Sequence, residues 1–417
     1  MGIWEERGLA IAESNTVKKN RLGWQVPSQS GNGTYIVNMD NGEPFCTCQH
    51  FEATHKKCQH IYAIEFIVKK EQLPDGTITE TRAVKITYGQ DWPIYNEAQT
   101  HEQERFPELL SELCKGIVEP EQKGAGRRSH SLSDVIMGAT CKVYSTMSGR
   151  RAMTDLRELQ AKGFITKAPS YNSIFDYLGN PALTPLLKSL IEESARPLKA
   201  IERDFAVDSS GFATTTYDRW FDHKWGKVRS EAKWIKTHLM CGVTTHVVTS
   251  IEVTPTETAD APMFVGLVQA TAHNFRIHEV SADKAYSSRK NLRAVNAVGG
   301  VAYIPFKNRT TGCGGHGDGF DGLWNYMWAY FNYNRAEFLN HYHKRSNSES
   351  ALSMIKAKFG GSVRSKSPIA QVNEVLCKVL CHNICVLLNS IVGMGLEPTF
   401  WNNRAEMTPA RQLAPLG

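Results

Sequence analysis

The order of strand-like and helix-like segments between residues 201 and 392 constrains the fold more than any other feature of this 417-residue chain. Three segments typical of strands are followed in turn by a helical, a strand-like, a helical and a last strand-like segment. This order predicts a mixed α/β domain over 201–392, with helices on its sheet. The predicted strands are 205–207, 239–243, 246–253, 280–282 and 301–306, and the predicted helices are 260–271, 288–298, 322–342, 348–359 and 368–392.

The rest of the chain divides by composition into three further regions. Residues 1–92 are predicted to form a small unit with strands at 24–26 and 35–37 and a helix from Ile61. Residues 93–200 have a helical pattern, and residues 393–417 are a tail. The helical region is as compatible with a helix-turn-helix-like DNA-binding unit as with plain helical packing, because no motif in it is diagnostic.

Charge and hydropathy narrow the class of protein. The net charge of +6 and the pI of about 8.7 suit a nucleic-acid partner without demonstrating one. Residues 219–236 interleave lysine and arginine with tryptophan, which fits either a phosphate-binding face or a solvated strand. No apolar run approaches the roughly 18 residues of a membrane span, and the first residues lack the layout of a signal peptide. We therefore expect an intracellular protein without a membrane partner.

Two aspartates occupy the same local setting. Asp208 ends the apolar run 205–207, and Asp283 ends the run 280–282. Two such strands side by side would bring the carboxylates together, where like charges repel unless a cation lies between them. Magnesium prefers oxygen ligands of this kind. For either aspartate alone, the simpler interpretation is that it caps the turn that follows.

A third carboxylate lies in a helical pattern. Tyr342, Arg345, Glu349 and Lys356 follow one another at offsets of 3, 4 and 7 residues. At about 100° per residue they share one sector of roughly 60° on a single helix. Glu349 could complete a metal site on this face. Arg345 and Lys356 could neutralise phosphates, and Tyr342 could donate a hydrogen bond or stack on a base. An exposed helix with incidental charges is the other interpretation.

These residues resemble the DDE transposases of bacterial insertion sequences, in the group marked by a Tyr-x2-Arg-x3-Glu-x6-Lys signature. The four residues from Tyr342 to Lys356 match that signature. The runs 207–212 and 282–286 resemble the family's blocks around its first and second aspartates, with Ala285 where the family often has glycine. The resemblance covers roughly residues 93–390. It implies an RNase H-like fold and an enzyme that cleaves and joins DNA strands.

The resemblance also implies cofactors and partners. Asp208, Asp283 and Glu349 would bind two magnesium or manganese ions and support two-metal phosphoryl transfer. The other three residues of the signature would contact DNA. The implied partners are the double-stranded DNA of the transposon ends and the target, bound by a homodimer. The implied location is the cytoplasm of a prokaryote, at the nucleoid.

Cysteines near the N-terminus follow a metal-ligand spacing. Cys46 and Cys48 form a Cys-x-Cys pair, and Cys58 and His60 form a Cys-x-His pair nine residues later. Three thiolates and one imidazole are typical of one structural zinc ion. The arrangement resembles the SWIM zinc finger, a module associated with DNA or protein binding that most insertion-sequence transposases lack. Two histidines of the intervening loop are possible substitutes for His60: His50 and His55.

Three functions are compatible with these patterns. The chain could be an active transposase, a transposase-derived DNA-binding regulator without catalysis, or a metal-dependent nuclease that cuts but does not join. The presence of all three acidic residues favours an active enzyme over the regulator. Inverted repeats flanking the coding region would separate a transposase from a nuclease.

Overall fold

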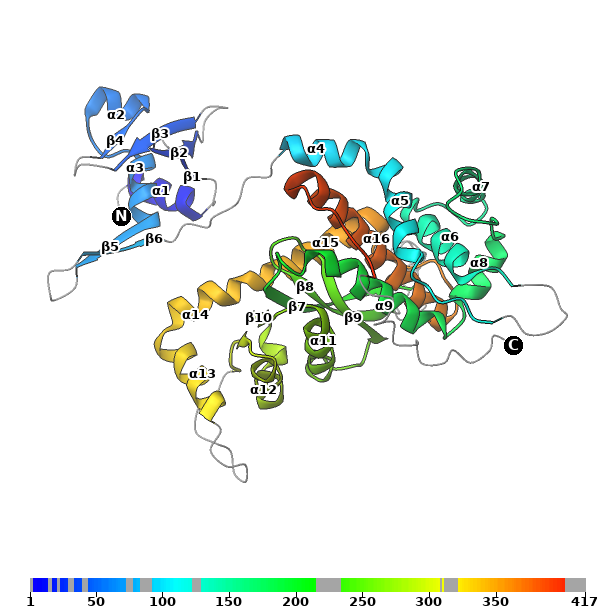
Figure 1. The fold of residues 1–417 in the computed structure, drawn as a ribbon. Coiled ribbons are helices and arrows are strands. Elements are labelled where there is room, and N and C mark those ends of the chain that lie inside the picture. The colour runs from blue at the N-terminus through cyan, green and yellow to red at the C-terminus, as the bar shows by residue number, and fades with distance from the viewer. Residues whose placement is uncertain are drawn as a thin grey trace, which may run out of the picture. The chain divides into compact units, whose positions relative to one another are not determined.

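The computed structural model of the chain divides into two compact units, residues 1–90 and 91–417. Figure 1 shows the fold of each. The structure describes all residues except 1–2, 14–16, 21–22, 29–33, 40–43, 73–77, 83–91, 122–128, 215–233, 308–309, 311–321 and 402–417. Most of the Trp- and Lys-rich stretch 219–236 therefore lies outside the described residues, as does the expected tail at 393–417 beyond Trp401.

The first unit packs helices against a four-stranded antiparallel sheet of order β1-β2-β3-β4. The strands predicted at 24–26 and 35–37 are confirmed as parts of β2 and β3. Alternate residues of these strands, among them Trp24, Val26 and Val37, form the core with Ile61 and Ile64. The elements are α1 (Ile3–Glu13), β1 (Lys18–Asn20), β2 (Gly23–Pro27), β3 (Thr34–Asn38), β4 (Phe45–Cys46), α2 (Gln49–Thr54), α3 (Gln59–Ile67), β5 (Val68–Gln72) and β6 (Ile78–Arg82).

The second unit is built on a five-stranded mixed sheet of order β11-β10-β7-β8-β9. Strands β7, β8 and β9 form an antiparallel meander, whereas β10 runs parallel to both β7 and β11. This sheet and the helices that flank it confirm the predicted α/β, RNase H-like fold class. The strands are β7 (Asp204–Ala213), β8 (Trp234–Gly242), β9 (Val248–Pro255), β10 (Glu279–Ala282) and β11 (Val301–Tyr303).

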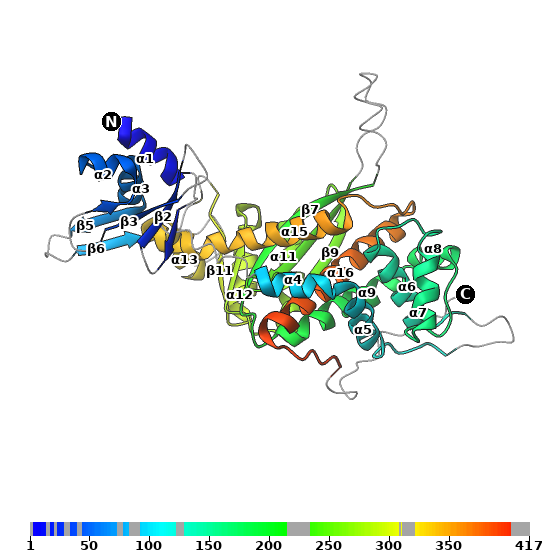
Figure 2. The same cartoon turned by 90° about the horizontal axis from the view of Figure 1, so that it is seen from above.

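Helices cover both faces of this sheet, because the strands alternate their apolar residues between two cores. On β7, Phe205 and Val207 pack into the core on the side of α11 (Ala261–Asn274) and α12 (Arg289–Ala297). Ala206 and Phe212 face the opposite core, beneath α15 (Ser346–Phe359) and α16 (Pro368–Met394). Figure 1 shows the sheet between these two layers, and Figure 2 shows α15 lying across it. Asp208 and Ser210 lie between Ala206 and Phe212 and face α15.

The long helix α16 corrects the statement that no apolar run approaches the length of a membrane span. By length and composition its 27 residues could cross a membrane, but 83% of its most apolar window is buried inside the protein. It packs against α6 and α9, and the predicted helical region therefore shares a core with the sheet. Helix α6 is buried on nearly every side, which leaves it no free face for a DNA groove. The helices of this region are α4 (Trp92–Thr100), α5 (Glu102–Cys114), α6 (Leu132–Tyr144), α7 (Met153–Ala161), α8 (Tyr171–Leu178), α9 (Leu183–Ala195) and η1 (Arg196–Leu198).

The segment that carries the Tyr-Arg-Glu-Lys pattern is not a single helix, so that part of the sequence prediction is wrong. A 3₁₀ turn, η3 (His343–Arg345), separates α14 (Arg335–Tyr342) from α15, and α13 (Gly322–Tyr333) precedes them. Three consecutive side chains explain the interruption, because each donates a hydrogen bond to the carbonyl three residues earlier and competes with regular helix bonding. These bonds run from Ser346 to His343, from Asn347 to Lys344 and from Ser348 to Arg345, at 3.0, 2.8 and 2.7 Å.

Candidate active site and metal-ligand cluster

The two aspartates lie on neighbouring central strands. In the parallel pair β7–β10, Val207 is opposite Ala282. Asp208 directly follows Val207, and Asp283 directly follows Ala282. Asp283 follows the last residue of β10 and caps η2 (Lys284–Tyr286), accepting a hydrogen bond of 2.8 Å from the Lys284 backbone N–H. Asp208 does not end its strand as expected, because β7 continues to Ala213. The sheet therefore brings the two positions together where β10 ends.

Several opposing effects act on the pKa of Asp208. Its side chain is only 18% exposed, and burial raises the pKa of the carboxyl. A 2.8 Å hydrogen bond from the Ser209 backbone N–H and the charge of Arg345 oppose this rise, whereas the nearby carboxylates of Glu349 and Asp283 add to it. Glu349 and Asp283 therefore lie close enough to Asp208 for their charges to raise its pKa.

Arg345 connects the first and third carboxylates. Its Nη1 lies 3.3 Å from Oδ2 of Asp208, and its Nη2 pairs with Oε1 of Glu349. Glu349 is 54% exposed at the start of α15, so the guanidinium joins a largely buried carboxylate to an accessible one. The side chains of Asp208 and Glu349 are thereby held on the same face of the sheet.

The other two signature residues, Lys356 and Tyr342, also pack against the second unit's sheet or core. Lys356 Nζ lies 2.6 Å from Oγ of Ser210 and 5.3 Å from the centre of the Phe212 ring, and burial lowers the pKa of this lysine. Ser210 is two residues beyond Asp208 on the same side of β7. Tyr342 is half-buried and packs against the core on the side of α11 and α12.

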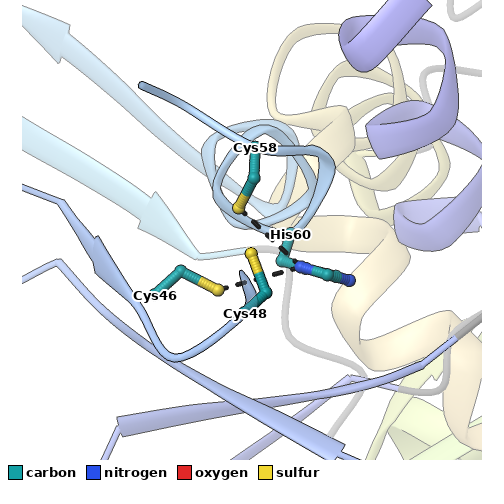
Figure 3. A group of neighbouring side chains, drawn as sticks. All are labelled: Cys46, Cys48, Cys58 and His60. Carbon is teal, nitrogen blue, oxygen red and sulfur yellow. Dashed lines mark hydrogen bonds between the residues drawn. The ribbon is translucent and has the colours of Figure 1, made fainter. Parts of the chain in front are cut away.

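The predicted zinc ligands converge in the first unit. The ligand atoms of Cys46, Cys48, Cys58 and His60 all lie within 4.8 Å of one another, and all four residues are buried. His60 Nδ1 is 3.8 Å from Sγ of Cys46 and 3.7 Å from Sγ of Cys58. Ligands at about 2.3 and 2.0 Å from one tetrahedral ion are separated by about 3.5 Å, so the spacing fits a metal ion. Figure 3 shows the four side chains pointing toward one another.

One thiolate is favoured in this cluster, at Cys58, whereas burial raises the pKa of Cys48 and the interaction with Cys58 raises that of Cys46. Cys48 caps α2, and its sulfur accepts a hydrogen bond of 3.5 Å from the Phe51 backbone N–H. Cys58 directly precedes α3, and its pKa is lowered to about 3, first by a hydrogen bond from Cys46 and also by bonds from His60 and the Ile61 backbone. A deprotonated sulfur is the form that binds a metal.

A second group of possible ligands was not anticipated from the sequence. Asp204, His278 and Glu279 also bring their ligand atoms within 4.8 Å of one another. A sequence signal for it exists, because Asp204 precedes the apolar run that ends at Asp208, and Glu279 precedes the run that ends at Asp283. Each central strand thus has an acidic residue at both ends of a three-residue apolar run.

Comparison with known proteins gives one family match in each of the two units. Residues 199–384 match the family described as "Transposase DDE domain", and residues 35–69 match the "SWIM zinc finger". The chain carries a transposase DDE domain. Among solved structures it is similar to a cryo-EM structure of a piggyBac transposase synaptic complex with hairpin DNA, at 13% identity and a TM-score of 0.36, over 74% of this chain and 79% of that one.

The matched ranges agree with the sequence prediction of a DDE transposase with an N-terminal SWIM finger. The three cysteines and the histidine of the cluster lie inside the SWIM match, and the three acidic residues lie inside the match to the transposase DDE domain. This domain implies a divalent metal, and the SWIM finger implies zinc.

Proposed function

We propose that the chain is a DNA transposase that binds the ends of its insertion sequence and catalyses metal-dependent strand cleavage and strand transfer. Asp208, Asp283 and Glu349 are its catalytic carboxylates. The observation that carries this proposal is the strand register that brings Asp208 beside Asp283, together with the Arg345 guanidinium that joins Asp208 to Glu349.

The donor set fits two magnesium or manganese ions. Asp208, Asp283 and Glu349 offer only carboxylate oxygens, which are the ligands that these hard cations take. Burial and two neighbouring acids raise the pKa of Asp208, and a bound cation relieves both effects. When bound, the ions lower the pKa of the attacking water or 3′-hydroxyl and stabilise the leaving oxygen.

The remaining signature residues position DNA. Arg345 pairs with the carboxylates of Asp208 and Glu349. Once metal ions neutralise part of the negative charge of these carboxylates, some of the guanidinium N–H groups can donate to a DNA phosphate instead. Lys356 holds its ammonium beside Ser210 on the strand that carries Asp208, where it neutralises the backbone near the scissile phosphate. Tyr342 donates a hydrogen bond or stacks on a base.

The first unit binds one structural zinc ion through Cys46, Cys48, Cys58 and His60. The mutual distances, the burial of all four residues and the helix starts at Cys48 and Cys58 support this ligand set. The double-stranded DNA partners of the whole chain are the transposon ends and the target, and a homodimer of the chain holds them. The reaction takes place at the nucleoid, in the cytoplasm.

The test is a reaction of the purified chain with a labelled duplex that contains the element's end and with a supercoiled target plasmid. We expect magnesium or manganese to support both cleavage at the end and joining to the plasmid, and calcium or EDTA to support neither. Cleavage without joining under all conditions would identify a nuclease. Specific binding of the end without cleavage in either metal would identify a DNA-binding regulator.

A further inference from the structure

The 3₁₀ turn η3 carries a second cation whose partners lie away from the three catalytic carboxylates. Lys344 Nζ is 2.6 Å from Oδ2 of Asp204 and 2.8 Å from Oε2 of Glu279. These two acids are direct partners in the β7–β10 register, so their carboxylates lie side by side. Glu279 is only 7% exposed, and a buried carboxylate of this kind needs a cation. Lys344 supplies it to both acids at once.

Two histidines complete the network around Lys344. His341 Nδ1 lies 2.9 Å from the Glu279 carboxylate, and its ring stacks on Tyr303 of β11 with centroids 4.3 Å apart. His278 Nδ1 lies 3.2 Å from Oδ1 of Asp204. The network therefore ties the end of α14 and the turn η3 to three adjacent strands, β7, β10 and β11.

The arrangement has a geometric consequence for Arg345. Asp204 and Asp208 are four residues apart on β7 and face the same side. Lys344 and Arg345 are consecutive in η3, yet Lys344 reaches the first of these aspartates and Arg345 reaches the second. The turn thus lies over the first half of β7, with one cation extended toward Asp204 and the other toward Asp208.

We infer that Lys344 is a positioning residue: by pairing with Asp204 and Glu279 it fixes η3 over β7, so that Arg345 reaches Asp208 and Glu349. This inference rests on the proposed function, because it assigns Lys344 to the orientation of that same site. The ammonium lies within hydrogen-bonding distance of both carboxylates, so Lys344, rather than a metal ion, is the cation that these two acids hold.

The test uses Lys344→Met, which keeps the length of the side chain and removes the charge. Misplacement of a guanidinium by about 1 Å is expected to lower the single-turnover cleavage rate roughly tenfold to a hundredfold. The double variant Lys344→Met/Arg345→Ala should be no slower than Arg345→Ala alone, because the lysine acts through the arginine.

Matched variants separate positioning from general stability. Lys188→Met removes another half-buried lysine that pairs with a carboxylate, Glu252, and it should leave the rate unchanged. Lys344→Arg keeps the charge and should restore most of the rate, including when Lys344→Met folds poorly. Wild-type rates in Lys344→Met, or additive losses in the double variant, would overturn the inference.

A readout without catalysis keeps the inference separate from the proposed function. Hydrogen exchange of peptides that cover 343–352 should quicken in Lys344→Met and stay unchanged in Lys188→Met, and this holds even if the wild-type chain cleaves no DNA. Unchanged exchange in Lys344→Met would overturn the positioning role. Binding of a second zinc ion by the wild-type chain, lost on His278→Ala, would also overturn it by showing that a metal occupies the network.

Discussion

The guanidinium of Arg345 lies 3.3 Å from the carboxylate of Asp208, although the two residues are 137 positions apart in the chain. The same guanidinium pairs with Glu349, so one cation links the first acidic residue to the third. The positive charge lowers the pKa of Asp208 against the effects of burial and of the neighbouring acids. Arg345 therefore favours the ionised form of Asp208, which is the form that can bind a metal.

This relationship predicts the pH dependence of Arg345→Gln. Removal of the positive charge raises the pKa of Asp208 further, so the carboxyl stays protonated to a higher pH. The acidic limb of the pH profile of the cleavage rate therefore shifts to higher pH. The profile is measured under single-turnover conditions with saturating magnesium. Arg157→Gln, on the exposed side of α7, is the control and should retain the wild-type profile. An unshifted acidic limb in Arg345→Gln would show that Arg345 does not control ionisation at the site.

A second prediction concerns the end of α15. Lys378 is buried and donates hydrogen bonds of 2.8, 2.8 and 2.7 Å to the carbonyls of Phe359, Gly360 and Ser362. Lys378→Met leaves these acceptors without their donor and should lower the free energy of unfolding by about 3 kcal/mol. Urea unfolding of the variant is compared with that of Lys366→Met, an exposed lysine nearby. Equal unfolding midpoints for the two variants would refute this role.

A third prediction separates the two units. Cys58→Ser should release zinc and unfold the first unit, because the ion is held by four ligands and links β4 to α3. The second unit has its own cores and should keep its thermal transition. Zinc content by mass spectrometry and calorimetry measure the two effects. Cys114→Ser, a buried cysteine of the second unit, should keep one zinc per chain. Full zinc content in Cys58→Ser would rule out this ligand set.

A fourth prediction tests phosphate contact by Lys356. Lys356→Ala should weaken binding of the end DNA and flatten the dependence of log K on log salt by about one unit of slope. Gel-shift titrations at several salt concentrations give the slope. Lys290 is exposed on α12, across the sheet from α15, and Lys290→Ala should keep the wild-type slope. If Lys356→Ala also keeps the wild-type slope, Lys356 does not contact a phosphate, and its role is limited to the hydrogen bond with Ser210.

Local patterns predicted much of the structure. The order of strands and helices from residue 201 gave the mixed sheet, because each segment's apolar period reflects its own burial. The clustering of four possible ligands around Cys58 was predictable because they lie within 15 residues of the sequence. The two aspartates were predictable as neighbours because each follows an apolar run of a central strand.

Features that depend on competition or on distant partners escaped prediction. The interruption at η3 arises because Ser346, Asn347 and Ser348 bond to nearby carbonyls, and helical spacing alone does not report that competition. The burial of α6 depends on α16, more than 200 residues later in the chain. The network of Asp204 and Glu279 with Lys344 depends on the turn η3, which brings Lys344 to acids that lie 140 and 65 residues earlier in the chain.

The most direct test of the central claim is metal rescue of Asp283→Cys. If Asp283 binds a catalytic ion, a thiolate in its place should bind magnesium poorly and the softer, more thiol-tolerant manganese better. We predict that the variant loses cleavage of the end DNA in magnesium and regains a measurable part of it in manganese. Glu252→Cys, at a half-buried position of β9 that pairs with Lys188, should behave as the wild-type chain in both metals. Wild-type cleavage by Asp283→Cys in magnesium would contradict the assignment of Asp283, and with it the three-carboxylate site.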